Sequence, residues 1–446
     1  MISSSLLHAP AHGLAADLKQ RFEKLGRPIR IGLIGCGEMG TDVITQCEHM
    51  VGITVAAVAS RKIINAQNAM SIAGKSIESY AVVDNAIEMS NAMTSGKTAI
   101  TEDAQLVCTA PQIDVVIDAT GRPAVGAEIG LVAMEHGKHL VMMNVEGDVC
   151  IGAFLKREAK RLGVVYTLGA GDEPSSCMEL IDFVTALGYP IVAAGKGKNN
   201  PLNIAATPDD YAEEAKRRNM NVRMLVEFVD GSKTMVEMAA ISNATGLVPD
   251  KAGMHGPTAI LTELEKYLCP VADGGILSRK GVVDFTVGKG VAPGVFVIAE
   301  ISHPRMRERM NDLKLGAGPY YRFYRPYHLT SLEVPLSCAR AVLYGTPDME
   351  PRDVPTSEVC ALAKRDLKVG ERLDAVGEYT YRAWIMTVGE ARAKKALPCG
   401  VIENGKVIKT IKQGELLTND NIAVDAESKI VQLRNRQDAM LKLAAS

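Results

Sequence analysis

One stretch near the N-terminus constrains the fold more than any other, residues 29–61, IRIGLIGCGEMGTDVITQCEHMVGITVAAVASR. An apolar run at 31–34 is followed by a complete G-x-G-x-x-G, then by helical apolar spacing, and then by a second apolar run at 53–59. Strand, glycine turn, helix and strand in this order form the dinucleotide-binding unit of Rossmann-type sheets. The turn residues expected at the cofactor are Gly35, Cys36, Gly37, Glu38, Met39 and Gly40.

Each glycine of this turn has a separate physical reason. Gly35 permits a tight turn, Gly37 lets the backbone approach a pyrophosphate, and Gly40 lets the helix pack closely on the strand. The first N–H groups of the helix then face the phosphates. A glycine loop that only turns the chain is the alternative, and the length of the whole unit argues against it.

The end of the second strand indicates which nicotinamide cofactor binds. NAD-binding domains place Asp or Glu about twenty residues after the glycines, where it bonds the ribose hydroxyl. This chain has Ser60, Arg61 and Lys62 there, with no carboxylate to repel a 2′-phosphate. Because the forked guanidinium donors suit phosphate, the sequence favours NADPH, with Ser60 and Arg61 at the cofactor. A solvated loop with two incidental cations is the alternative.

Apolar strands alternate with helical segments as far as residue 168, which predicts a doubly wound parallel α/β sheet. We expect helices in the polar insertion at 62–99 and a hairpin-type turn at 230–233, although Glu237 and Met238 could equally open a helix. The expected domains are an NADP-binding Rossmann domain at 1–169 to which a helix at 331–345 returns, an α+β substrate and dimerisation domain at 170–330, and a small β-rich domain at 351–446.

The composition and net charge of the chain argue against several classes of protein. The net charge of −2 gives no general surface for nucleic acid, and no apolar run is long enough to span a membrane. The nine cysteines are scattered without a C-x-x-C pair, which favours free thiols in a reducing compartment. The first residues lack a signal-peptide pattern. We therefore expect a cytoplasmic protein with a small-molecule substrate.

Ligands of such sheets bind at the carboxyl ends of the strands. Thr120, Gly121 and Asn144 follow two predicted strands and are expected near the nicotinamide. Asp172 and Glu173 follow a third, and adjacent carboxylates in a turn suit Mg²⁺ or Mn²⁺. The alternative is a pair of acidic residues that stabilises the start of a helix through its dipole.

Three further segments are candidates for the substrate. The glycine-rich segment at 195–200 is predicted to be a cationic loop that binds a phosphate or carboxylate group. A surface turn is the alternative. The tyrosine- and arginine-rich segment at 320–328 suits an anionic ligand or a dimer surface. His255 lies in a predicted loop and is either a lid residue or incidental. The residues expected to bind or act on substrate are Lys196, Lys198, Asn199, Asn200, His255, Arg322, Tyr324 and Arg325.

The nucleotide unit, Thr120-Gly121 and the phrase Gly137-Lys138-His139-Leu140-Val141 resemble homoserine dehydrogenase. That family has G-K-x-V-V-T-A-N-K with a catalytic final lysine. Here Asn144 matches the family's Asn, but Val145 stands where the lysine should be. The departure argues against ordinary homoserine dehydrogenase activity.

Two segments in the last hundred residues, 363–371 and 411–418, share a sequence pattern: an apolar run, a basic residue and then Gly-Glu. This pattern resembles that of a SAF domain. With the homoserine-dehydrogenase-like body, this layout is similar to the 1-deoxy-D-xylulose 5-phosphate reductoisomerase-like enzymes. The resemblance implies NADPH, a divalent metal held by Asp172 and Glu173, a homodimer, and synthesis of 2-C-methyl-D-erythritol 4-phosphate for isoprenoids in the MEP pathway.

Two other functions stay open. One is a simpler NADP-dependent oxidoreductase that acts on a hydroxy acid or a sugar acid and needs no metal. The other is a protein that binds NADP without turnover and uses its C-terminal domain to hold a partner. Fold alone does not decide between these functions.

Overall fold

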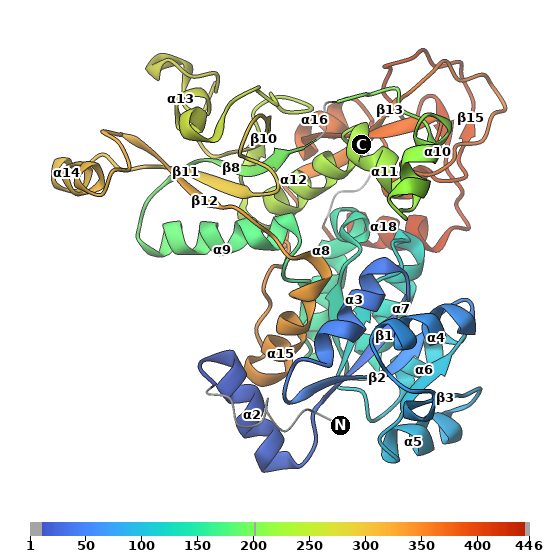
Figure 1. The fold of residues 1–446 in the computed structure, drawn as a ribbon. Helices are drawn as coiled ribbons and strands as arrows, with labels where there is room; N and C mark the ends of the chain where they lie inside the picture. The colour runs from blue at the N-terminus through green and yellow to red at the C-terminus, as the bar shows by residue number, and fades with distance from the viewer. Residues whose placement is uncertain (1–10, 200–201, 442–446) are drawn as a thin grey trace. The chain divides into compact units, whose positions relative to one another are not determined.

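The computed structural model describes residues 11–199 and 202–441, which form two compact units (Figure 1). The first contains the chain up to Asp172 together with Leu329–Glu350. The second contains Glu173–His328 and the chain from Pro351 onwards. The segment Glu173–His328 of the second unit is therefore inserted into the first unit in the sequence. Within the described residues, no helix is long and apolar enough to cross a membrane.

The first unit is built on a seven-stranded, fully parallel sheet in the order β3-β4-β2-β1-β5-β6-β7. The prediction of a doubly wound parallel sheet is confirmed. Its strands are β1 (Ile29–Ile34), β2 (Ile53–Ala59), β3 (Tyr80–Val82), β4 (Thr98–Thr101), β5 (Val115–Asp118), β6 (His139–Met142) and β7 (Tyr166–Leu168). Its helices are α2 (Leu14–Leu25), α3 (Glu38–Cys47), α4 (Ile63–Ile72), α5 (Ala86–Thr94), α6 (Ala104–Thr109), α7 (Pro123–Glu135), α8 (Val145–Leu162) and α15 (Val334–Tyr344).

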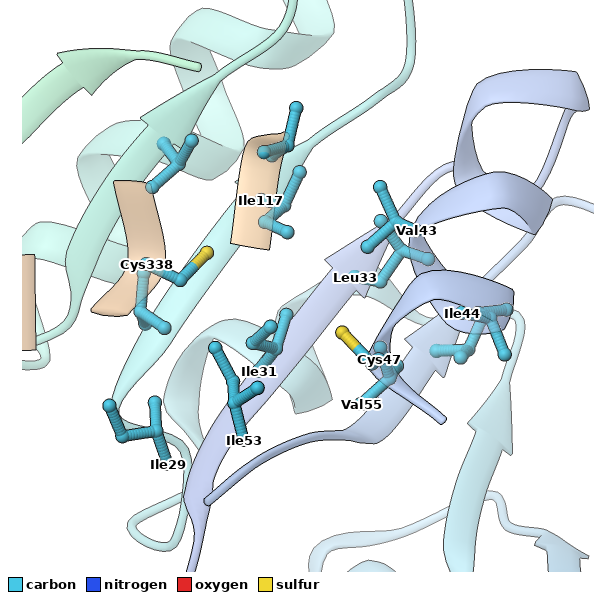
Figure 2. Close-up of a cluster of buried hydrophobic side chains, with 14 of the residues drawn as sticks. Ile29, Ile31, Leu33, Val43, Ile44, Cys47, Ile53, Val55, Ile117 and Cys338 are labelled. Carbon is cyan, nitrogen blue, oxygen red and sulfur yellow. The ribbon is translucent and has the colours of Figure 1, made fainter. Parts of the chain in front are cut away.

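Helices cover both faces of this sheet. Figure 2 shows Ile31 and Leu33 of β1 in one buried cluster that also contains Cys338 of α15. On the opposite face, Gly32 lies so close to Val107 of α6 that an added Cβ would come within 2.5 Å of it. Because β1 is buried on both faces, its sequence reads as a continuous apolar run without alternation.

The insertion at 62–99 differs from the prediction of helices alone. It contains α4 and α5, but also the edge strand β3 and its neighbour β4. Both strands are short, and single-sequence patterns of three or four residues carry little periodic signal.

The second unit contains a mixed five-stranded sheet in the order β12-β11-β8-β10-β9. Its strands are β8 (Ile191–Lys198), β9 (Val248–Pro249), β10 (Val282–Val287), β11 (Val295–Glu300) and β12 (Tyr320–Arg325). Its helices before residue 329 are α9 (Glu173–Ala186), α10 (Pro208–Arg217), α11 (Val222–Val229), α12 (Ser232–Thr245), α13 (Leu264–Tyr267) and α14 (Pro304–Asp312). β8 is a central strand, parallel to β10 and antiparallel to β11.

The predicted hairpin at 230–233 is wrong, because two helices meet there. Asp230 ends α11, and its carboxylate accepts the Ser232 N–H at 2.8 Å at the start of α12. The apolar residues Leu225, Val226 and Val229 lie on one side of α11 and pack in a small core. An Asp-Gly pair serves the start of a helix as well as a hairpin turn, so tertiary packing decided between them.

The C-terminal segment packs within the second unit. Its elements are β13 (Ser357–Ala363), β14 (Tyr381–Thr387), α16 (Val388–Ala393), α17 (Cys399–Ile402), β15 (Lys406–Val407), β16 (Ile422–Ala423) and α18 (Lys429–Met440). β13 and β14 form an antiparallel pair that lies against α12. Ala383 of β14 donates its N–H to Ser232 Oγ at 2.9 Å, and Asn243 Oδ1 accepts from Ser357 at 2.9 Å. The SAF-like character of this segment stays a prediction.

Candidate functional site

The glycine turn after β1 has the geometry of a dinucleotide cradle. Gly35 has φ +102°, and an added Cβ would lie 2.5 Å from the carbonyl oxygen of Ala119, in the turn after β5. At Gly40 a Cβ would lie 2.3 Å from the carbonyl oxygen of Gly35. Gly37 has open space where a Cβ would be, at the N-terminus of α3. Two glycines therefore allow close packing, and the third leaves room for a phosphate group.

The other turn residues differ in exposure. Glu38 is exposed, whereas Cys36 and Met39 are half-buried. Burial raises the pKa of the Cys36 thiol to about 11, so this thiol is neutral at physiological pH.

The end of β2 presents a cation and a nearby carboxylate. Ser60 is buried and donates its N–H to Thr101, while Arg61 and Lys62 are exposed at the start of α4. Glu102, which follows β4, accepts the N–H of Ile63 at 3.3 Å. Glu102 was not among the predicted residues, because it follows a strand that was not predicted.

A buried polar network supports the turn after β5. Asp118 is fully buried, and its carboxylate accepts the Thr120 N–H at 2.9 Å and the Asn144 side chain at 3.4 Å. Asn144 in turn accepts the Gly147 N–H at the start of α8. Burial raises the pKa of Asp118. The network holds the Thr120-Gly121 turn beside Gly35. The side chain of Asn144 forms its hydrogen bonds to Asp118 and Gly147, within the protein.

The most unusual electrostatic feature of the second unit is centred on Lys196. Its Nζ lies 2.6 Å from Glu173 Oε1 and also bonds Glu237, which is fully buried in α12. Burial alone would lower the pKa of Lys196, but Glu173 and Glu237 outweigh it and raise the pKa above its ordinary value. Lys196 is thus a permanently charged, buried ammonium group between two carboxylates.

Lys198 lies two residues further along β8 and has a different environment. Its Nζ donates to the carbonyl oxygen of Phe228. Burial and the charge of Lys196 lower its pKa to about 8, against the opposing effect of Asp230 and Glu237. A lysine that titrates near neutral pH can bind an anion or exchange a proton.

The prediction of a lysine loop at 195–200 is wrong, because Lys196 and Lys198 are residues of β8. The glycines on either side of Lys196 allow close packing: a Cβ at Gly195 would lie 1.6 Å from the carbonyl oxygen of Asp284, and a Cβ at Gly197 would lie 2.4 Å from the backbone nitrogen of Ala292. Asn199 follows the strand and is exposed. Asn200 lies outside the described residues.

Groups suited to a divalent metal gather at the N-terminus of α9. His328 Nε2 lies 3.4 Å from Glu173 Oε1. Asp172, which the peptide bond places directly before Glu173, completes a group in which one ligand atom from each residue lies within 4.8 Å of the others. Carboxylate oxygens and one imidazole fit Mn²⁺ or Mg²⁺. His328 was not predicted, because it stands at the end of the tyrosine-rich segment without a local motif.

Both arginines of β12 and its Tyr324 bond within the protein. Arg322 pairs with Glu265 at 2.6 Å, and Arg325 pairs with Glu179 at 2.9 Å. The hydroxyl of Tyr324 donates to the carbonyl oxygen of Val291 at 2.8 Å. β12 is an edge strand of its sheet.

His255 is held by two carboxylates. Its ring Nε2 lies 2.7 Å from Asp250, and its backbone N–H donates to Asp284 at 3.1 Å. Asp284 is fully buried in β10, and burial raises its pKa. The contact with Asp250 orients the imidazole; the role of His255 in substrate binding stays a prediction.

Two known protein domains match this chain in sequence. Residues 35–161 match the homoserine dehydrogenase NAD-binding domain, and residues 171–334 match the catalytic domain of oxidoreductase DRL. Both matches are to domains of oxidoreductases. Lys196, Glu173, Glu237 and His328 all lie within the second match.

Curated relatives match only in part. Homoserine dehydrogenase from Methylobacillus glycogenes is 32% identical over 28% of this chain and 27% of its own length. Homoserine dehydrogenase from Pseudomonas aeruginosa is 28% identical over 32% of this chain and 29% of its own length. The chain therefore spans less than a third of each of these relatives.

Solved structures resemble the chain weakly. A probable dehydrogenase from Thermotoga maritima has a TM-score of 0.41 and 13% identity, covering 71% of this chain and 90% of its own. A DOX-P reductoisomerase in complex with magnesium has a TM-score of 0.33 and 13% identity, covering 47% of this chain and 56% of its own. Likeness at this level carries no information on substrate.

Proposed function

We propose that this protein is an NADP-dependent oxidoreductase that acts on the alcohol or carbonyl group of a small hydroxy acid or sugar acid. The observation that carries the proposal is the buried charge cluster of Lys196, Glu173 and Glu237, in a segment that matches an oxidoreductase catalytic domain. Buried charges of this kind are typical of functional sites. The homoserine-dehydrogenase-like match of the first unit supports hydride transfer as the chemistry.

The two units have different roles in the proposed reaction. The first holds the cofactor on the glycine turn. In the reducing direction NADPH gives a hydride to the carbonyl carbon, the oxygen takes a proton, and the products are an alcohol and NADP⁺. Lys198 has a pKa of about 8 and is the candidate to hold the carboxylate or phosphate of the substrate or to supply this proton.

A second candidate function is favoured by the ligand group at Asp172, Glu173 and His328. It is the conversion of 1-deoxy-D-xylulose 5-phosphate to 2-C-methyl-D-erythritol 4-phosphate, a reductoisomerase reaction. A divalent metal bound there would supply a Lewis acid for two adjacent substrate oxygens. Lys198 would then hold the phosphate group. Plain hydride transfer does not need such a metal.

One assay separates these candidates. NADPH oxidation is followed at 340 nm with 1-deoxy-D-xylulose 5-phosphate and Mn²⁺ or Mg²⁺, with and without EDTA and fosmidomycin. In parallel, NADP⁺ reduction is screened with hydroxy acids and sugar acids. Metal-dependent, fosmidomycin-sensitive oxidation supports the reductoisomerase, whereas EDTA-resistant turnover of an acid supports the dehydrogenase. NADPH binding without turnover in both arms would contradict both.

Asp172→Asn gives a second test of the same choice. If the metal is needed, we expect kcat/KM to fall by about 10² or more, because the amide is a poor ligand for a hard cation. In a metal-independent dehydrogenase we expect a change of less than about tenfold. Glu308→Gln, in an exposed pair on α14, is the control for a lost surface carboxylate.

The preference for NADPH is tested by Arg61→Ala. The dissociation constant of NADPH should rise by roughly 10- to 100-fold, since a charge-assisted bond to phosphate is worth about 1.5–3 kcal/mol, while that of NADH should change little. Arg161→Ala on α8 removes an exposed arginine from the same unit and is the matched control. A wild-type protein that binds NADH more tightly would contradict the assignment and point to Glu102 at the ribose.

We also propose that the protein forms a homodimer. Light scattering on the purified protein would test this proposal.

A further inference from the structure

The carboxylate that a metal would need is already bound by a cation of the protein. Glu173 Oε1 lies 2.6 Å from Lys196 Nζ and 3.4 Å from His328 Nε2. A divalent cation on this carboxylate would meet the ammonium group at a distance where like charges repel strongly. Lys196 and a metal therefore compete for Glu173.

Glu237 offers the ammonium group a second position. It belongs to α12 and bonds Lys196 from a fully buried site. The backbone of Lys196 is fixed, because β8 is paired on one side with β10 and on the other with β11. Only the flexible side chain has to move for Lys196 to release Glu173 while it stays with Glu237.

We propose that Lys196 is an internal counter-cation of the metal site. Without metal it neutralises Glu173; when metal binds, its ammonium group passes wholly to Glu237, and Glu173 becomes a ligand. Lys196 and Glu237 are thus positioning residues that set metal affinity without touching the metal. The inference rests on the metal-dependent form of the proposed function.

Two variants of the full chain test the exchange. In Glu237→Gln the second position loses its charge, so Lys196 stays on Glu173 and the Mn²⁺ dissociation constant should rise by at least about tenfold. In Lys196→Met/Glu237→Gln the net charge of the pair is unchanged, but no ammonium group competes. The Mn²⁺ affinity should then return to the wild-type value or exceed it.

The measurement is a Mn²⁺ titration in which free Mn²⁺ is detected by electron paramagnetic resonance, so it does not depend on turnover. Lys280→Met/Glu300→Gln removes an exposed pair of the same unit at 2.7 Å and should bind Mn²⁺ as the wild type does. NADPH binding and the thermal midpoint, measured on every variant, show whether each one is folded.

The outcomes are distinct. A double variant as weak as Glu237→Gln would mean that the pair only supports the structure, and it would overturn the exchange. An unchanged affinity in Glu237→Gln would overturn it as well. A wild-type chain that binds no Mn²⁺ would refute the metal-dependent form of the function itself.

Discussion

Replacing Glu173 by glutamine is expected to lower kcat/KM by about 10²–10³, the size of loss that follows removal of one preorganised electrostatic group. The neutral amide cannot pair with Lys196 at 2.6 Å, no longer places a carboxylate 3.4 Å from the imidazole of His328, and is a weaker metal ligand. The effect is measured by steady-state kinetics with the substrate that the NADPH assay identifies.

The control for this substitution is Glu308→Gln, the same change in an exposed pair with Arg305. It should change kcat/KM less than about twofold, as exposed pairs contribute little. The NADPH dissociation constant should be unchanged in both variants, because the glycine turn belongs to the other unit. Full activity in Glu173→Gln would remove Glu173 from the site.

The second large effect concerns stability. Lys364 of the C-terminal segment is 1% exposed and forms an ion pair at 2.7 Å with Asp230, which is 0% exposed. Its Nζ also donates to the carbonyl oxygens of Ala206 at 2.8 Å and Glu378 at 2.9 Å. Lys364→Met leaves the Asp230 carboxylate buried without this cation, which costs about 3–5 kcal/mol. We expect the thermal midpoint of the second unit to fall by roughly 10 °C.

The chain supplies both the control and the probe for this measurement. Lys412→Met breaks a pair with Asp366 in which the side chains are 67% and 55% exposed, and it should leave the thermal midpoint nearly unchanged because exposed pairs contribute little. The single tryptophan, Trp384, lies in β14 and packs on Gly253, so its fluorescence follows unfolding of this unit. Asp230→Asn added to Lys364→Met should recover part of the loss; equal midpoints for the Lys364 and Lys412 variants would contradict the prediction.

The sequence predicted the first unit well for a physical reason. Glycines that must avoid a clash, as Gly35 and Gly40 do, leave a local signature, and strands buried on both faces read as apolar runs. The missed strands β3 and β4 are too short for such a signature. Their absence from the prediction also hid Glu102 at the end of β4.

The candidate site of the second unit was predicted less completely. Asp172 and Glu173 are adjacent and follow a strand, so the sequence shows them together. Glu237 and His328 are 64 and 155 residues from Glu173 (237 − 173 and 328 − 173), and only tertiary packing joins them to it. The lysine segment was predicted as a loop because its glycines resemble a turn, whereas in β8 they admit neighbouring backbone.

The discontinuous first unit has a consequence for synthesis of the chain on the ribosome. Val334, Cys338 and Ala339 of α15 complete the same buried cluster as β1 and β2. Figure 2 labels Cys338 in this cluster. This core therefore cannot close until more than 330 residues have been translated, although its whole sheet is made within the first 168. At about 5–20 residues per second the nascent sheet waits for many seconds with the part of this face that α15 covers still exposed. The chain is thus expected to depend on protection of this face while the inserted unit is being made.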